Sequence, residues 1–292
     1  MKAGDYKVEA GTVVTLRVAR EVPFGFFLTD GEEDVLLHLT EVKESITVDE
    51  EIEVFLYQDH EGRLSATLTI PTVQMGQYDW VEVVEVKKNL GVFVNIGLKK
   101  DILVSMDDLP ALFSLWPTVG DKLYCSLKVD NKQRLYGKLG TEEVMRQLAI
   151  PADPSVFNKN VKGTVYRLLL AGSFIITEEE YMGFIHESER KEEPRLGQEV
   201  EGRIIDVKED GTINVSLLPR THEQIDDDAN IIFEYLQGRG GSMPYWDKSL
   251  PEDIQKRFNM SKGAFKRALG KLMKEEKIVQ EDGWTHFKNK EK

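Results

Sequence analysis

Three copies of a short glycine–phenylalanine pattern constrain this chain more than any other feature. Each copy consists of a Gly, one variable residue, a Phe and an aliphatic residue, as at 25–28. The glycines Gly25, Gly91 and Gly172 lie 66 and 81 residues apart. Such self-similarity is typical of tandem structural units. The repeat therefore indicates how the rest of the chain is divided.

Each copy lies in the same succession of short β-type runs. A β-rich run precedes the glycine, the glycine itself begins a second run, and three further runs separated by turn residues follow. This gives five short strands in about 60 residues. An open sheet of this size leaves two unpaired edges, and closure into a five-stranded barrel removes them. We therefore predict a multidomain, mainly β fold with three OB-type barrels in tandem.

After Pro219 the hydrophobic periodicity becomes helical. Ser249 and Glu252 have the spacing of a capping box, and Ser261 has the position of an N-cap. Helix, helix, helix and hairpin is the order of a winged helix-turn-helix domain. The expected elements are three helices at 226–236, 253–258 and 262–277, and a hairpin around an Asp-Gly turn at 278–287.

The domain boundaries follow from these changes of pattern. A short capped helix at 141–148, followed by Pro151 and Pro154, predicts a stiff spacer between the second and third copies. The charged fraction of 30% fits several small domains with much surface. The predicted domains are OB-type repeats at 1–71 and 72–140, a helical linker at 141–158, an OB-type repeat at 159–219 and a winged-helix domain at 220–292.

Composition limits the function classes. The 292 residues carry a formal net charge of −13, so any phosphate-binding surface is expected to be local. One such region is 256–277, with eight Lys or Arg against two Glu. The single Cys125 excludes an intrachain disulfide framework and a CxxC zinc site. Without an 18-residue apolar run or a signal-peptide core, a soluble cytoplasmic protein with no membrane contact is expected.

No catalytic constellation is found in the sequence. The five histidines are scattered, and no HExxH pair, GxSxG elbow or Walker-type loop occurs. Adjacent side chains within each acidic run, 178–180 and 226–228, point in different directions, so these residues are interpreted as solvated loop or helix-cap residues. We therefore expect no enzyme activity, no cofactor and no metal.

The first copy predicts a surface on which bases can stack. Side chains alternate along a strand, so Phe26 and Leu28 share the core face and Phe27 faces solvent. Phe24 has core-side parity unless a bulge at Gly25 turns it outward. Two exposed rings form a stacking platform for unpaired bases, because every base has a π-face. The alternative is that both rings are ordinary barrel core, since Phe is usually buried.

The third helix of the C-terminal region has two faces. At 100° per residue, Phe265, Ala268, Leu269, Leu272 and Met273 fall on one apolar side. The opposite face is expected to contact phosphate, although a merely solvated lysine-rich face is the alternative. Glycines at 263 and 270 lie on this face, where they let a nucleic-acid backbone approach. The expected contacts are Lys262, Lys266, Arg267, Lys271 and Lys274, whereas the nearby aromatics Tyr245, Trp246 and Trp284 are expected in the domain core.

These patterns resemble the RNA-binding repeat of ribosomal protein S-one, which is an OB-fold. In that family two aromatics, a His, an Asp and an Arg supply one RNA-binding face. The matching residues of the first copy are Phe24, Phe27, His38, Asp59 and Arg63, so the full set is present there.

The other two copies keep part of this set. The second has a leucine for the first aromatic, and the third has Lys208 and Thr212 in place of the Asp and the Arg. The resemblance thus implies RNA contact most fully for the first copy, and leaves spacing or protein contact as roles for the others. The retained family residues are Phe93, Asp130, Arg134, Phe174 and His186.

The order of the domains resembles the conserved virulence factor B family of Gram-positive bacteria, and 249–277 carries much of that likeness. The resemblance implies a cytoplasmic RNA-binding regulator of gene expression. Our first hypothesis is a protein that binds single-stranded RNA through the first copy and the winged helix, which can also take duplex nucleic acid. The alternatives are a DNA-binding transcriptional regulator and a non-catalytic accessory of a ribonuclease.

Overall fold

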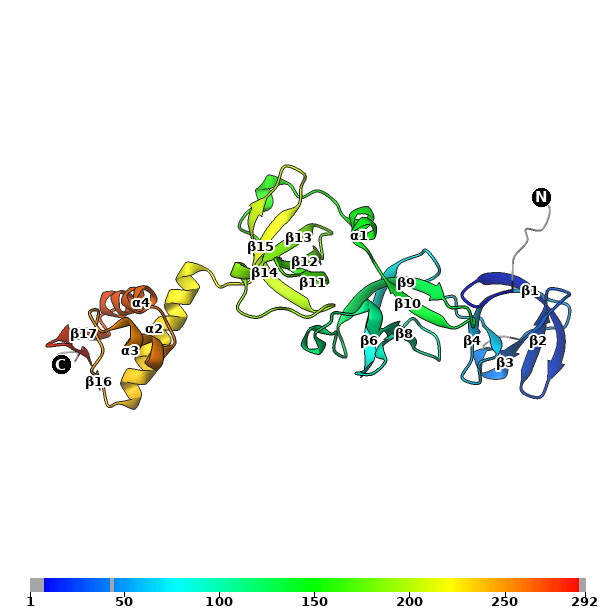
Figure 1. Ribbon diagram of the computed structural model, residues 1–292, viewed down its shortest axis with the longest axis horizontal. Coiled ribbons are helices and arrows are strands. Elements are labelled where there is room, and N and C mark those ends of the chain that lie inside the picture. The colour runs from blue at the N-terminus through cyan, green and yellow to red at the C-terminus, as the bar shows by residue number, and fades with distance from the viewer. Residues whose placement is uncertain (1–7, 43–44, 289–292) are drawn as a thin grey trace. The chain divides into compact units, whose positions relative to one another are not determined.

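The computed structural model describes residues 8–42 and 45–288 and divides into two units, one ending at Leu217 and one beginning at Leu218. The first unit contains three closed five-stranded barrels (Figure 1). The second contains three helices and a small three-stranded sheet. The predicted fold class, three OB-type barrels and a winged helix, is confirmed.

The three barrels share one topology, in which the first, second and third strands pair in sequence and the fifth closes against the third. Barrel 1 consists of β1 (Val13–Val22), β2 (Gly25–Thr29), β3 (Asp34–His38), β4 (Glu51–Gln58) and β5 (Leu64–Thr67). Barrel 2 consists of β6 (Asp79–Lys87), β7 (Gly91–Asn95), β8 (Ile102–Ser105), β9 (Lys122–Val129) and β10 (Leu135–Leu139). Barrel 3 consists of β11 (Asn160–Leu169), β12 (Gly172–Thr177), β13 (Met182–His186), β14 (Glu199–Val207) and β15 (Ile213–Ser216). Short 3-10 turns lie at Leu39–Glu41, Met106–Asp108, Phe113–Leu115, Pro154–Val156 and Glu187–Glu189.

Close strand packing explains why each copy begins with glycine. A Cβ at Gly25 would lie 2.1 Å from the Leu37 carbonyl oxygen on the next strand. The same atom would lie 2.0 Å from the carbonyl oxygen of Val104 at Gly91, and 2.2 Å from that of Ile185 at Gly172. No side chain fits so near a paired backbone, so glycine is the only residue that allows the second and third strands to meet.

The register corrects one prediction about the first copy. No bulge lies at Gly25, whose pairing with β3 is regular. The irregularity lies instead in the first strand, between Val18 and Arg20, and the first strands of barrels 2 and 3 have it at the equivalent place. The extra residue increases the local twist and turns Arg20 to the side of Phe27, with which it pairs.

Within the first unit, a helix joins barrels 2 and 3 through a shared apolar cluster. The helix α1 (Glu142–Leu148) is capped by Thr141, which confirms the short capped helix. Its buried Met145 packs with Trp80 and Tyr124 of barrel 2, and with Ile176, Met182 and Tyr166 of barrel 3. Burial raises the pKa of the Tyr166 hydroxyl to about 12.

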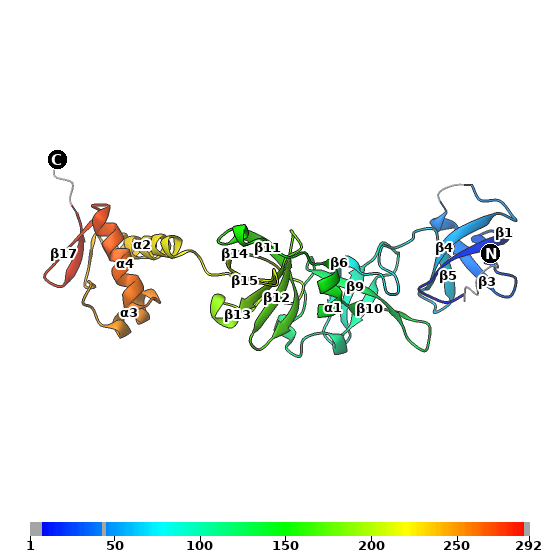
Figure 2. The same cartoon turned by 90° about the horizontal axis from the view of Figure 1, so that it is seen from above.

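The second unit has the element order of a winged helix. Its elements are α2 (Thr221–Gly238), β16 (Ser242–Met243), α3 (Pro251–Phe258), α4 (Lys262–Lys274), β17 (Ile278–Glu281) and β18 (Trp284–Phe287). The helix α4 packs on α2, α3 and β17 (Figure 2). Its Ser261 cap, bonded by the Ala264 N–H, and the Asp282-Gly283 turn are confirmed.

Four details of this unit differ from expectation. The helix α2 spans Thr221–Gly238 and is therefore longer than the expected 226–236. The capping box at α3 does not form, because Ser249 Oγ accepts from the Trp246 N–H in a preceding turn, 2.9 Å away. The last helix ends at Lys274 rather than near Lys277, because Glu276 adopts a left-handed φ of 57° and closes it. The two-residue strand β16 was not foreseen, since nothing so short has a visible period.

Candidate nucleic-acid interface

Barrel 1 carries a row of side chains across its outer wall. Its members are directly opposite one another on successive strands: Arg20, Phe27, Leu36, Ser65 and Tyr57. Phe26 and Leu28, on the other parity, are buried in the barrel core as predicted. The sequence pattern located Phe27 in this row and missed its neighbours, because their places depend on the bulge and on non-local pairing.

The two candidate rings lie together outside the barrel core. Phe24 is 49% exposed, because it belongs to the turn between β1 and β2 and not to a strand. Its ring meets the half-buried ring of Phe27 edge to face, with centroids 6.4 Å apart and planes at 81°. The turn therefore gives Phe24 the outward position that was expected from a bulge.

The ring of His38 caps a 3-10 turn at the end of β3. Its Nδ1 accepts the Thr40 N–H at 3.2 Å and lies 2.8 Å from Thr40 Oγ1. Since a backbone N–H can only donate, Nδ1 is the acceptor, and the hydrogen of the neutral ring is on Nε2. Ser105 and His186 cap the matching turns of barrels 2 and 3. The histidine thus has a structural role and also presents an outward N–H donor.

Asp59 and Arg63 form an ion pair at the end of the same wall. Arg63 donates to Asp59 Oδ2 through Nε at 3.0 Å and through a terminal nitrogen at 2.9 Å. Burial alone raises the pKa of Asp59, but hydrogen bonds from Arg63 and from the Glu61 N–H outweigh it and lower that pKa. Arg63 is exposed, and it also makes a 2.6 Å ion pair with Glu61.

Barrel 2 brings its retained residues together in an equivalent row. Phe93 pairs with Leu103 on β8, which pairs with Tyr136 on β10. The Arg134 guanidinium lies 5.6 Å from the centre of the Tyr136 ring and makes a 2.6 Å ion pair with Asp130. Hydrogen bonds from Arg134 hold the pKa of Asp130 below its usual range. This barrel thus has two rings and a guanidinium on its wall.

Barrel 3 has more aromatic surface than its sequence match indicated. Phe174 pairs with Phe184, and their ring centroids are 4.9 Å apart, while Phe184 lies 6.2 Å from His186. The Lys208 N–H donates to the Thr212 carbonyl oxygen, as the Asp59 N–H donates to the Arg63 carbonyl oxygen in barrel 1. The two turns therefore occupy equivalent positions in their barrels. Phe184 adds a ring at the position where barrels 1 and 2 have Leu36 and Leu103.

In each barrel a cation lies over the central phenylalanine. Arg20 is 4.3 Å from the Phe27 centroid, Lys87 is 4.8 Å from that of Phe93, and Arg167 is 5.6 Å from that of Phe174. Each cation also pairs with a carboxylate, on Asp34, Glu85 and Glu142 respectively. Each phenylalanine ring is thus covered on one side by a cation whose charge is balanced by a neighbouring carboxylate.

The five basic candidates on the winged-helix face differ in whether they form ion pairs. Lys271 pairs with Asp226 of α2 and lies 3.5 Å from Glu275. No ion pair is found for the other four, Lys262, Lys266, Arg267 and Lys274, within the described part of this unit. Nothing lies within 4 Å of a Cβ built at Gly270, so this helix face is open.

Two residues assigned to the winged-helix core are exposed. Met273 is 46% exposed in the last turn of α4, which ends earlier than expected. Trp284 is 40% exposed, because it lies on the face of β18 opposite to the buried Thr285, and its ring stacks on His286 at 6.3 Å. The remaining predicted core residues of α4 are buried, and Tyr245 packs against them.

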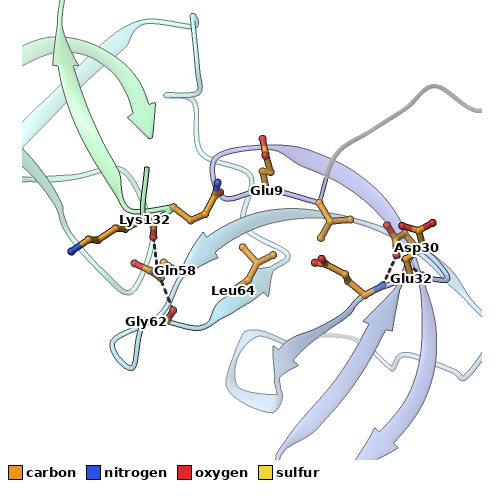
Figure 3. A pocket seen from close by; sticks show the side chains of 10 residues that line it. Glu9, Asp30, Glu32, Gln58, Gly62, Leu64 and Lys132 are labelled. Atoms are coloured by element: carbon orange, nitrogen blue, oxygen red, sulfur yellow. Dashed lines mark hydrogen bonds between the residues drawn. The ribbon is translucent and has the colours of Figure 1, made fainter. Parts of the chain in front are cut away.

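A large hollow beside barrel 1 has the wrong charge for phosphate. It measures about 830 Å³, and four acidic residues and one lysine are among its lining residues. Figure 3 shows Glu9, Asp30 and Glu32 around it, with Lys132 on its far side. Nucleic acid is therefore not expected in this hollow.

Other kinds of site find no support in the described residues. Across 8–42 and 45–288, no group of three or more His, Cys, Asp or Glu side chains has a geometry that could hold a metal ion. No helix in these residues is long and apolar enough to cross a membrane. The single cysteine, Cys125, is buried in barrel 2, and burial raises the pKa of its thiol to about 12.

Comparison with known proteins gives this architecture a family. The chain is 42% identical over 255 residues to conserved virulence factor B of Staphylococcus epidermidis, covering 86% of this chain and 85% of that protein. The chain belongs to the conserved virulence factor B family. It is also 51% identical over 284 residues to the uncharacterised protein YitL of Bacillus subtilis, covering 97% of this chain and 95% of that one.

Family models and a solved structure agree with this membership. An S1 domain matches 10–69, a first S1-like domain of the family matches 78–138, its second domain matches 145–219 and its winged helix domain matches 230–287. A crystal structure of a multidomain protein with nucleic acid binding domains from Streptococcus pneumoniae is 41% identical. It covers 96% of this chain and 99% of its own, with a TM-score of 0.67. These matches suggest nucleic-acid binding and a part in virulence regulation.

Proposed function

We propose that this protein binds single-stranded RNA and regulates gene expression after transcription, in the cytoplasm and without catalysis. The observation that carries the proposal is the edge-to-face pair of Phe24 and Phe27 outside the core of barrel 1, a barrel that also carries His38 and the Asp59–Arg63 ion pair on its surface. Exposed rings bind unpaired bases in any sequence, whereas bases inside a duplex are already stacked.

The winged helix supplies the second contact of this proposal. Lys266, Arg267 and Lys274 are exposed on α4 and free of carboxylate partners in the described part of their unit. Such cations bind phosphates without regard to sequence and release counterions, so their contribution falls as salt rises. Two moderate contacts on one chain gain affinity when one RNA spans both.

Binding measurements on two double variants test the proposal. Phe24→Ala/Phe27→Ala should weaken binding to single-stranded RNA by about 1–3 kcal/mol for each base that is no longer stacked. Lys266→Ala/Arg267→Ala should mainly change the salt dependence of binding. The slope of log K against log[salt] should become shallower by about 1 for each phosphate that the variant no longer binds. The exposed Phe157, 58% accessible and outside the rows, gives the matched control Phe157→Ala.

Duplex DNA in the same salt series separates the competing functions. A preference for duplex DNA that the aromatic variant does not change would refute our proposal and favour a transcriptional regulator that uses the winged helix. Cleavage of the RNA by purified wild type would contradict the non-catalytic part of the proposal.

A further inference from the structure

A small cavity lies where barrels 1 and 2 meet within the first unit. It measures about 150 Å³, and both barrels line it. Tyr57 from β4 forms one side, while Phe93, Leu103 and Tyr136 from barrel 2 form another. The four side chains are members of the two outer rows, so the cavity joins the row of barrel 1 to the row of barrel 2.

Specific contacts hold the walls of this junction cavity. The Lys100 ammonium of barrel 2 donates to the carbonyl oxygens of Gln58 and Asp59 in barrel 1, at 3.0 and 3.1 Å. Gln58 Nε2 donates back to the Lys132 carbonyl oxygen at 3.2 Å (Figure 3). Beneath them, the fully buried Phe55 of barrel 1 belongs to the apolar core of barrel 2. The cavity is therefore a feature of packed elements and not of loose side chains.

Its size and chemistry fit one planar ring. An engineered protein cavity of about 150 Å³ binds benzene, which shows that this volume accepts a six-membered ring. Tyr57, Phe93 and Tyr136 all line this space, and within the described residues no ring contact joins Tyr57 to the other two. Arg134 and Lys100 also line the cavity, together with the carboxylate of Asp101, and the two cations are the groups there that can contact the attached phosphates.

We propose that the junction cavity binds one base of a single-stranded RNA whose preceding or following bases stack on Phe27 of barrel 1. Phe27 and Tyr57 are three strand positions apart in their row, at most about 14 Å, so they serve different nucleotides. The inference rests on the proposed function and deepens it. It gives barrel 2, which lacks the first aromatic of the family set, a binding role shared with barrel 1.

Charge around the junction favours one route for the strand. The hollow of about 830 Å³, lined by four acidic residues and one lysine, shares Gln58 with the junction cavity. Phosphates are repelled on that side and attracted on the side of Arg134. The strand therefore passes along the Arg134 side into the row of barrel 2.

Two cavity variants and two matched controls test this site. Tyr57→Ala removes a wall, and Leu103→Trp fills the space, so each should weaken binding of fluorescein-labelled oligouridine about 5- to 150-fold by anisotropy. Leu112→Trp adds an indole at a position 63% exposed and outside the cavity, and this control should bind within about twofold of wild type. Tyr57→Phe keeps the ring and should recover most of the binding that Tyr57→Ala loses.

Photo-crosslinking of wild type with 4-thiouridine RNA is independent of any folding defect in the variants. Crosslinks at Tyr57 or Tyr136 are expected. The inference is overturned if RNA binding depends on Phe27 while both cavity variants bind normally, an outcome that leaves the proposed function intact. It is also overturned if Leu103→Trp alone has an effect and Tyr57 is never crosslinked, because the base would then contact barrel 2 only. Absence of any RNA binding by wild type would remove both proposals.

Discussion

Replacement of Gly25 by alanine should unfold barrel 1 selectively. The new Cβ would lie 2.1 Å from the Leu37 carbonyl oxygen, far inside the 3.4 Å at which ordinary contact begins, and the backbone φ is +155°. The strained φ costs about 1–3 kcal/mol, and displacing a packed strand costs a similar amount. The expected loss is thus about 2–6 kcal/mol, a large part of what a small barrel has.

Amide hydrogen exchange read by mass spectrometry measures this loss, because the first tryptophan of the chain, Trp80, lies in barrel 2 and fluorescence does not report on barrel 1. Peptides from β1 to β5 should lose protection while those of barrel 3 keep it. The matched control is Gly31→Ala, which has φ +105° but nothing within 4 Å of its Cβ. Equal loss of protection in the two variants would refute the steric explanation of the repeat.

Three further predictions concern single groups. Cys125 should resist alkylation at pH 8 in the folded protein and react in urea, as mass spectrometry can show, because its thiol is buried and its pKa is raised to about 12. The pKa of Asp59 is lowered in the folded protein, so its carboxylate stabilises the fold above the unfolded-state pKa. This stabilisation is lost as the pH falls through the folded-state pKa. In Arg63→Ala the NMR titration of the Asp59 carboxyl group should move to higher pH. Lys271→Ala should change the salt slope of RNA binding less than Lys266→Ala, since Lys271 is already paired with Asp226, and equal slopes would contradict this.

The sequence predicts those features that depend on local pattern. The alternation of side chains along the strand correctly predicted that Phe26 is buried and that Phe27 lies outside the barrel core. Ser261 and the Asp282-Gly283 turn were recognised because caps and tight turns are local chemistry. The number and kind of domains followed from the repeat, since each copy has the strands of one closed barrel.

Features that depend on pairing between distant strands could not be predicted. The place of Arg20 over Phe27 depends on a bulge in β1 that no residue type marks. Phe184 joins Phe174 only through the register of β12 with β13. Ser249 had two possible partners, and only the fold decides between the helix N–H groups and Trp246.

The central claim is that bases, and not phosphates alone, provide the affinity of the barrels for RNA. It is tested most directly by comparing an oligouridine with a chain of equal length and charge whose nucleotides lack bases. Our account predicts that the abasic chain binds wild type more weakly by about 1–3 kcal/mol per stacked base, and that Phe24→Ala/Phe27→Ala removes part of this difference. Equal affinity for the two chains, in wild type and variant alike, would contradict the account.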